Sequence, residues 1–130
     1  MVDWGSIRHF KRQEFDSADE AGSGDRMDGP FLLQLNFLRG RCGFPFTIRS
    51  GYRTEQHNRF VGGSPNSAHL RGLAADIAVG SGPQRYRLVS QALQYGICRV
   101  GIGKDFVHLD CDESLPQEVI WLYPASQSFQ

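Results

Sequence analysis

Two histidines and one aspartate have the types and spacing of a catalytic metal site. His69 and Asp76 lie in the segment SAHLRGLAAD, which covers residues 67–76. Downstream, the segment DFVHLD over residues 105–110 supplies a second imidazole, His108, with a carboxylate on each side. Two imidazoles and one carboxylate commonly hold catalytic zinc and leave its fourth position for water or substrate. The three residues therefore predict a zinc site.

Two predicted strands position these residues. Residues 74–79 alternate so that Asp76 lies on one face of a strand and Ile77 on the other. In residues 106–110 the same alternation places His108 away from the apolar side chains that point toward a core. We expect His108 and Asp76 to share the sheet face that the helices leave open.

The remaining elements predict a single α+β domain over residues 1–130, which is enough chain for one core. The turn at residues 103–105 is short enough to make a hairpin of its flanking strands. We expect a small antiparallel sheet with helices packed on one face. Helices are predicted over residues 30–41, 55–61 and 83–95, and strands over residues 46–50, 74–79, 97–102, 106–110 and 119–123.

The pattern SxHxxGxAxD over residues 67–76, followed by HxD at residues 108–110, resembles the zinc D,D-carboxypeptidases and their relatives. These relatives are the D,D-dipeptidases of vancomycin resistance, phage L-alanoyl-D-glutamate endolysins and the hedgehog signalling domain. The resemblance covers residues 45–110 and implies a hedgehog/D,D-peptidase-like fold. It also implies one zinc ion per chain, held by His69, Asp76 and His108.

The same resemblance implies a general base. Relatives carry an acidic residue three positions before the last histidine ligand, which is Asp105 here. Strand parity points Asp105 away from His108 unless the chain bends at Gly103. Asp110, on the His108 face, is the alternative base, or it orients a ligand imidazole by accepting a hydrogen bond.

Arg53 and Ser67 are the other candidate site residues. Arg53, in the segment SGYR, is expected to balance negative charge on the reacting carbonyl or on a substrate carboxylate. A surface salt bridge with Glu55 is the alternative. Ser67 is expected to bind substrate or to cap the turn before His69. Gly103 stands where some relatives have a further histidine, so that imidazole is missing here.

Composition restricts the partners and the compartment. The formal net charge is zero, with 14 basic and 14 acidic residues, which argues against nucleic acid as a partner. The N-terminal segment has no signal-peptide pattern and no apolar stretch reaches the ~20 residues of a membrane span. We expect a monomer that stays in the cytoplasm at synthesis and does not insert into membranes. It would act on the cell wall if it is released as a phage lysis or virion enzyme.

The three cysteines, Cys42, Cys98 and Cys111, are an odd number without an export signal, so free thiols are expected. Cys111 lies three residues after His108 and is a minor candidate for a zinc ligand; a small buried residue at a strand end is the simpler interpretation.

The resemblance implies that this predicted zinc site belongs to a metallopeptidase that hydrolyses a bond next to a D-amino acid in peptidoglycan peptides. Carboxypeptidase and endopeptidase activity, and phage and bacterial origin, both stay open. The alternative function is a zinc-stabilised binding or structural module without turnover, for example one associated with a virion. Asp105 and Arg53 favour the enzyme, because the ligand triad is common to both.

Overall fold

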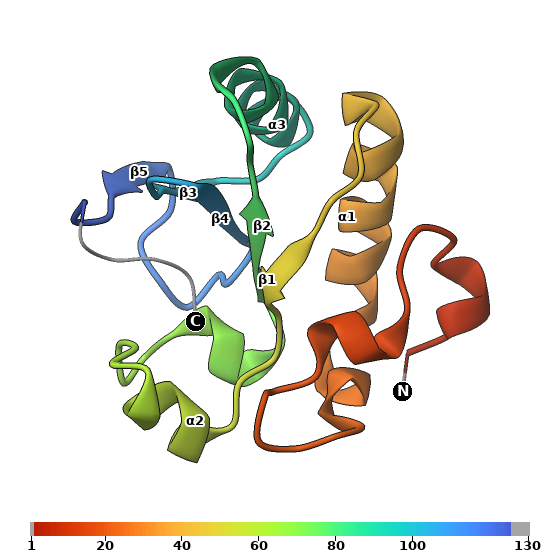
Figure 1. The fold of residues 1–130 in the computed structure, drawn as a ribbon, viewed down its shortest axis with the longest axis vertical. Helices are drawn as coiled ribbons and strands as arrows, with labels where there is room; N and C mark the ends of the chain where they lie inside the picture. Colours follow the sequence, from red (N-terminus) through yellow and green to blue (C-terminus); the bar gives the residue numbers. More distant parts are fainter. Residues whose placement is uncertain (1, 126–130) are drawn as a thin grey trace.

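Five strands form one mixed sheet in the computed structural model, which describes residues 2–125 (Figure 1). The strand order is β1–β2–β4–β3–β5. This arrangement confirms the predicted small α+β fold. The strands are β1 (Ile48–Ser50), β2 (Ala74–Ala78), β3 (Arg99–Ile102), β4 (Phe106–Asp110) and β5 (Val119–Leu122), and the helices are α1 (Gly29–Cys42), α2 (Glu55–Phe60) and α3 (Gly82–Gln94).

The sheet is antiparallel except at its edge, where β5 runs parallel to β3. Strand β4 ends at Asp110, which pairs with Arg99 at the start of β3. The connection over residues 111–118 therefore crosses the end of the sheet where β3 begins, and β5 starts beside Arg99. Because β5 enters from that end, it takes the direction of β3. The sheet is thus mostly antiparallel, as predicted, and β5 is the strand that departs from this pattern.

Side-chain caps fix where the helices begin. Asp28 accepts a hydrogen bond from the Phe31 N–H at the start of α1, and Thr54 accepts one from the His57 N–H at the start of α2. Helix α3 begins after Ser81 in the same way. Each cap satisfies a backbone donor that the helix itself leaves unpaired. The helix after Thr54 and the helix after Ser81 therefore begin where the sequence predicts.

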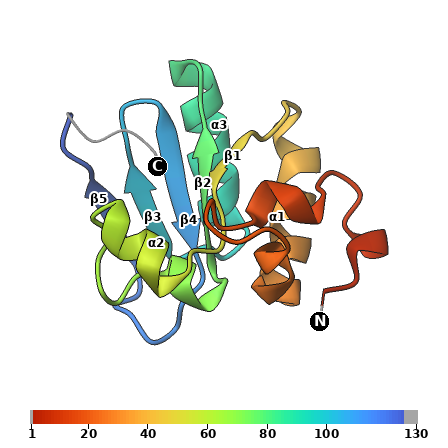
Figure 2. The same cartoon turned by 60° about the horizontal axis from the view of Figure 1, so that its bottom comes forward.

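The apolar core lies between the sheet and the helices α1 and α3. Helix α1 packs against α3, and α3 packs against β4. Figure 2 shows α3 behind the sheet and α2 in front of its lower end. The core includes Ile77 and Val107 from the sheet and Leu35 and Leu88 from the helices, all fully buried. The strand faces are divided as predicted, with the apolar residues turned toward the helices.

The opposite face of the sheet carries the site. Asp76 on β2 pairs with His108 on β4, which pairs in turn with Gly101 on β3. Gly101 pairs with Trp121 on β5. These four residues form one row across the sheet, because directly paired residues project from the same face. The row sets the spacing of the site by backbone hydrogen bonds.

The N-terminal segment supports the end of β1. It consists of short 3-10 turns and is held by buried Phe10 and Phe15. The Phe15 carbonyl accepts a hydrogen bond of 2.9 Å from the Tyr52 N–H. A Cβ at Gly51 would lie 2.7 Å from the Phe15 Cα, so the two chain segments are in backbone contact. This contact fixes the position of the Gly51 carbonyl, which lies within hydrogen-bonding distance of the His69 ring.

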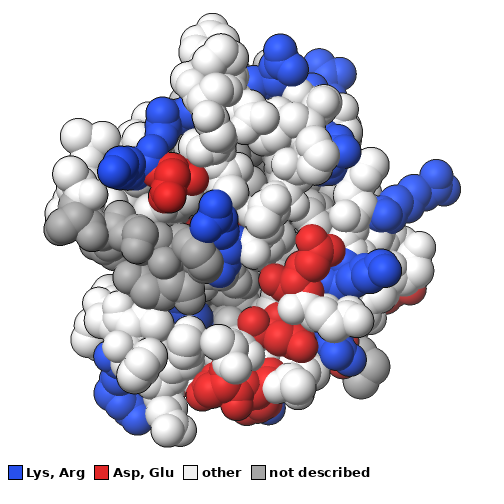
Figure 3. Space-filling model, in the orientation of Figure 1, with Lys and Arg blue, Asp and Glu red and all other residues white. Residues whose placement is uncertain are grey.

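Charges of both signs lie on the face shown in Figure 3, with acidic side chains gathered over its lower part and basic side chains spread around its edge. Among the described residues, no helix is both long and apolar enough to cross a membrane.

Candidate metal centre

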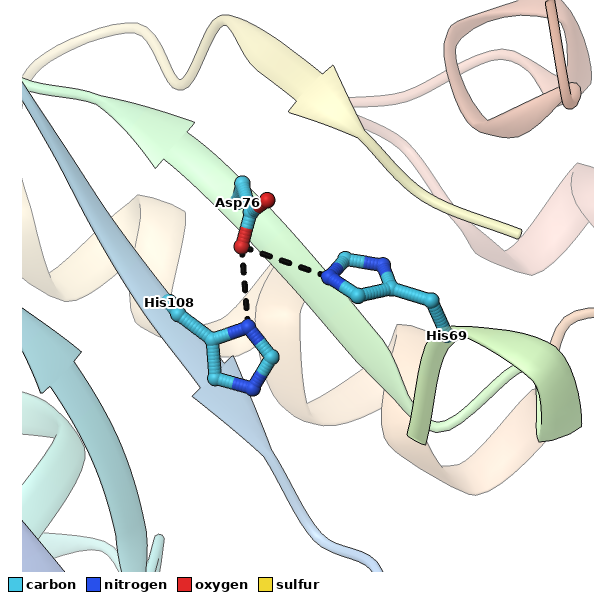
Figure 4. Close-up of side chains that lie close together, drawn as sticks. All are labelled: His69, Asp76 and His108. Carbon is cyan, nitrogen blue, oxygen red and sulfur yellow. Dashed lines mark hydrogen bonds and ion pairs between the residues drawn. The ribbon is translucent and has the colours of Figure 1, made fainter. Parts of the chain in front are cut away.

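Three buried side chains converge on one point between β2, β4 and the 3-10 turn Ala68–Arg71 (Figure 4). His69 Nε2 lies 3.3 Å from Asp76 Oδ1, and His108 Nδ1 lies 2.9 Å from the same oxygen. The three donor atoms all lie within 4.8 Å of one another. These are the three ligands predicted from the sequence, and the structure brings them together.

The orientation of His69 is set by a short turn whose two ends are both fixed. Ser67 accepts a hydrogen bond of 3.2 Å from the His69 N–H, and Gly72 ends the turn in the left-handed conformation with φ of 70°. His69 Nδ1 then donates to the Gly51 carbonyl at 2.6 Å. A carbonyl only accepts, so Nδ1 carries the proton and the Nε2 lone pair faces Asp76.

His108 is aimed by Asp110. His108 Nε2 donates to Asp110 Oδ2 at 2.7 Å, which leaves Nδ1 facing Asp76. The other oxygen, Asp110 Oδ1, accepts from Arg99 Nε at 2.7 Å and from the Asp112 N–H at 3.1 Å. A carboxylate that accepts a proton from a ligand imidazole fixes its tautomer and its ring orientation. Asp110 therefore has the orienting role that the sequence left open, and its oxygens are already occupied.

These hydrogen bonds test whether a metal ion fits. If each imidazole is neutral, its single proton is used at Gly51 or at Asp110. Two nitrogen lone pairs and the Asp76 carboxylate then face one another, and only a cation relieves this repulsion. Ligands ~2.0–2.1 Å from a tetrahedral zinc lie about 3.3 Å apart. The separations of 3.3 and 2.9 Å between Asp76 Oδ1 and the two imidazole nitrogens lie near this spacing, so the donor set fits zinc.

The titration of the three side chains leads to the same conclusion. Burial alone would raise the pKa of Asp76, but the adjacent His69 and His108 imidazoles outweigh burial and hold it well below its usual range. Burial lowers the pKa of His69. Burial would also lower the pKa of His108, but its bonds to Asp110 and Asp76 outweigh burial and raise it to about 9. Without a metal, a proton on His108 takes the place of the cation.

Arg53 lies under the site and not on the surface. The residue is 6% exposed, and Nε donates to Ser50 at 3.0 Å and Nη1 to Asn58 at 3.1 Å. Its Nη2 lies 3.4 Å from Asp76 Oδ2. The partner is thus Asp76 and not Glu55, and the guanidinium neutralises the oxygen that the imidazoles leave unused.

A cavity of about 650 Å³ opens over the three donors. Arg53 and Ser67 are among the residues that line it, and their contact with substrate stays a prediction. Ser67 also caps the turn before His69, as the alternative interpretation predicts. Asp105 is exposed at the β3–β4 turn and is not among the lining residues, while its carbonyl accepts from the Val79 N–H at 3.0 Å. Its role as base stays a prediction.

Cys111 lies outside the donor group. Its N–H donates to the Leu73 carbonyl at 3.1 Å. Burial and the neighbouring carboxylates raise the pKa of its thiol to about 12, so it stays protonated. All three cysteines are free thiols, as expected.

Four residues of the site were not identified from the sequence: Asn58, Arg99, Trp121 and Tyr123. Arg99 lies opposite Asp110 in the hairpin, so the pairing register would have revealed it. The other three come from segments whose approach to the site depends on the folded path of the chain. At Gly103 a Cβ would overlap the Phe106 ring, so the ring fills the space beside this glycine.

Structural zinc sites close their coordination with four protein ligands, whereas catalytic sites keep one position open. The described residues supply three donors, and the cavity opens beside them, so fold and site define a metal-dependent enzyme centre. The family model described as Peptidase M15 matches residues 8–110, and the chain belongs to this family of zinc peptidases. No curated protein matches the chain.

Proposed function

We propose that this chain is a zinc peptidase that hydrolyses an amide bond next to a D-amino acid in peptidoglycan peptides. It acts either as a D,D-carboxypeptidase or as an endolysin-like endopeptidase. The observation that carries the proposal is the position of His69, Asp76 and His108 at the cavity of about 650 Å³. That cavity has room for several residues of a peptide.

One zinc ion per chain, held by the three donors, would act as a Lewis acid and would make water nucleophilic near neutral pH. The side chains of the protein do the rest. Asp76 stays ionised, while Gly51 and Asp110 keep the two imidazoles in the required tautomers. The donor set is therefore prepared before substrate enters.

Arg53 is proposed to act on negative charge in the cavity. A guanidinium has five N–H donors, and Arg53 uses three of them on Ser50, Asn58 and Asp76. The two others are available to a substrate carboxylate or carbonyl oxygen. Its burial strengthens such a contact, because the surrounding dielectric is low. Ser67, at the rim, is the proposed hydrogen-bonding partner of the substrate backbone.

Asp105 remains the proposed base, since Asp110 is fully engaged with His108, Arg99 and Asp112. Asp105 lies in the short turn beside Gly103, and its neighbour Phe106 lines the cavity. Catalytic hydrogen bonds are often formed only when substrate is bound. The proposal therefore requires the Asp105 carboxylate to turn toward the cavity in the substrate complex.

The compartment and partners belong to the same proposal. A monomer made in the cytoplasm and carried to the wall as a phage lysis enzyme or virion component would meet peptidoglycan peptides there. A bacterial enzyme of wall recycling is the other source. In both cases the partner is a peptide of peptidoglycan, and neither nucleic acid nor a membrane is involved.

Digestion of purified murein, with and without a chelator, tests the function. Elemental analysis should find close to one zinc per chain, and mass spectrometry should show peptide products that disappear with the chelator and return with added zinc. Zinc-loaded protein that leaves murein peptides intact would refute the peptidase and favour the non-catalytic zinc module.

A further inference from the structure

Tyr123 extends the cavity wall beyond the metal donors. The Tyr123 N–H donates to the Ile102 carbonyl at 2.9 Å, so the chain continues alongside β3 for one residue past β5. The Tyr123 ring lies 5.1 Å from the Phe106 ring and 6.4 Å from the His108 ring, measured between centroids. Its side chain is one of those that line the cavity. The phenol therefore faces the same space as the donors.

Gly101 makes this position possible. It lies between His108 and Trp121 in the row across the sheet. A Cβ at Gly101 would come within 2.6 Å of the Tyr123 ring and 2.8 Å of the Trp121 ring. Any other residue would push both rings away from His108, whose ring lies 5.3 Å from that of Trp121. The glycine lets two aromatic side chains lie over the site.

The phenol brings one O–H donor to the cavity. Tyr123 is among the lining residues, and a tyrosine hydroxyl can both donate and accept a hydrogen bond. A phenol ordinarily keeps its proton throughout the neutral range, so this donor is present when substrate binds.

The cations of the cavity are more constrained. Arg53 is tied to Ser50, Asn58 and Asp76. Arg99 donates through Nε to Asp110 and through Nη1 to the Pro116 carbonyl at 2.6 Å, and it stacks over Trp121. A fixed cation attracts negative charge from a distance, whereas a neutral O–H gives a directed hydrogen bond to one oxygen.

We propose that Tyr123 donates a hydrogen bond to the oxygen of the scissile carbonyl and stabilises the negative charge that forms there during hydrolysis. The inference rests on the proposed peptidase function. In the reaction, the water oxygen bonds to the carbonyl carbon, the carbon–nitrogen bond breaks, and the proton taken from water passes to the leaving amine. Tyr123 gives up no proton and serves only as the donor to the oxygen.

Tyr123→Phe removes the hydroxyl and keeps the ring that packs on Phe106. Tyr86→Phe is the matched control, because Tyr86 is 77% exposed on α3. Zinc content, melting temperature, the kinetics of a murein-derived peptide and the binding of a phosphinic analogue of D-alanyl-D-alanine should be measured for both. The analogue has a tetrahedral, anionic centre, and calorimetry on zinc-loaded protein reads its affinity without turnover.

We expect Tyr123→Phe to keep zinc and stability, to lower kcat by roughly 10²- to 10³-fold with little change in KM, and to weaken analogue binding tenfold or more. Tyr86→Phe should match the wild type. An analogue affinity unchanged in Tyr123→Phe, a loss confined to KM, or a wild type that binds no analogue would each overturn the inference. A wild type that binds the analogue in a Tyr123-dependent way but leaves murein intact supports the donor and refutes only the proposed substrate.

Discussion

Replacing Asp110 with asparagine tests whether Asp110 orients the ligand His108 or acts as the general base. In the wild type, the Asp110 carboxylate is 1% exposed and accepts three hydrogen bonds, from His108, Arg99 and the Asp112 N–H. An asparagine of the same shape has one oxygen for these three donors. It also leaves Arg99, whose side chain is 12% exposed, without its counter-charge beside the metal site.

The size of the effect follows from these contacts. Losing an outer partner of a ligand histidine typically lowers metal affinity about 10- to 100-fold. Here the upper end is expected, because His108 loses a charge-assisted acceptor and the unbalanced Arg99 repels a cation. A hundredfold loss corresponds to about 2.7 kcal/mol of binding free energy. Added zinc should restore part of the activity.

Competition of each variant with a chelator of known zinc affinity measures the effect, and murein cleavage at saturating zinc measures turnover. Asp105→Asn is the contrasting variant. Asp105 is exposed and outside the donor group, so zinc affinity and thermal stability should stay unchanged. As the proposed base, its loss should lower the cleavage rate by about 10²- to 10⁴-fold.

The opposite pattern would refute this assignment. If Asp110→Asn binds zinc within threefold of the wild type but no longer cleaves murein, while Asp105→Asn stays active, the two carboxylates have exchanged roles. If neither variant loses cleavage, the base is another group.

Four further outcomes are expected. Gly72→Ala should lower the free energy of unfolding by at least about 2 kcal/mol in a denaturant titration, because φ is 70° and the added Cβ would overlap the Arg26 carbonyl. Gly62→Ala is the control, since Gly62 has a φ of 75° but open space around the added Cβ. It should lower the free energy of unfolding only by the backbone strain of about 1 kcal/mol. Zinc must displace a proton from His108, whose pKa is about 9 without metal, so affinity in the chelator assay should rise roughly tenfold per pH unit from pH 7 toward 9. Over the same window the metal-free protein should melt at lower temperature, because the stabilisation from the raised pKa is complete below about 6.5 and lost as pH rises through about 9. Alkylation of the unfolded protein without reductant should label three thiols; a single label would reveal a disulfide.

The alternation of side chains along the predicted strands was enough to place part of the site. Alternation along residues 74–79 and 106–110 places Asp76 and His108 on the open face, and the observed register pairs them directly. The hairpin register contains Arg99 opposite Asp110 as well. Alternation does not reveal that pairing, because it gives the two faces of the predicted strand over residues 97–102 and not the residues opposite them.

Other features depend on the folded path of the chain, which local patterns do not specify. The Gly51 carbonyl meets His69 because the N-terminal segment holds Gly51 against Phe15. Tyr123 reaches the cavity because β5 joins the sheet at its far edge, parallel to β3. The parallel pairing arises from where the connection over residues 111–118 crosses the sheet, and nothing in the alternation of β5 encodes its direction.

The buried charges of the cavity favour a catalytic over a structural role. Arg53 and Asp76 form one pair, and Arg99 and Asp110 form another, so the fixed charges that line the cavity cancel. A divalent ion held by Asp76 and two neutral imidazoles therefore adds two positive charges that no lining carboxylate balances. Burying uncompensated charge is costly, so the loaded site is most stable when an anion enters from solution. A substrate carboxylate meets this requirement, as does the negative charge that develops on a carbonyl oxygen during amide hydrolysis. A structural zinc site instead closes its coordination with protein ligands and leaves no positively charged cavity open to solvent.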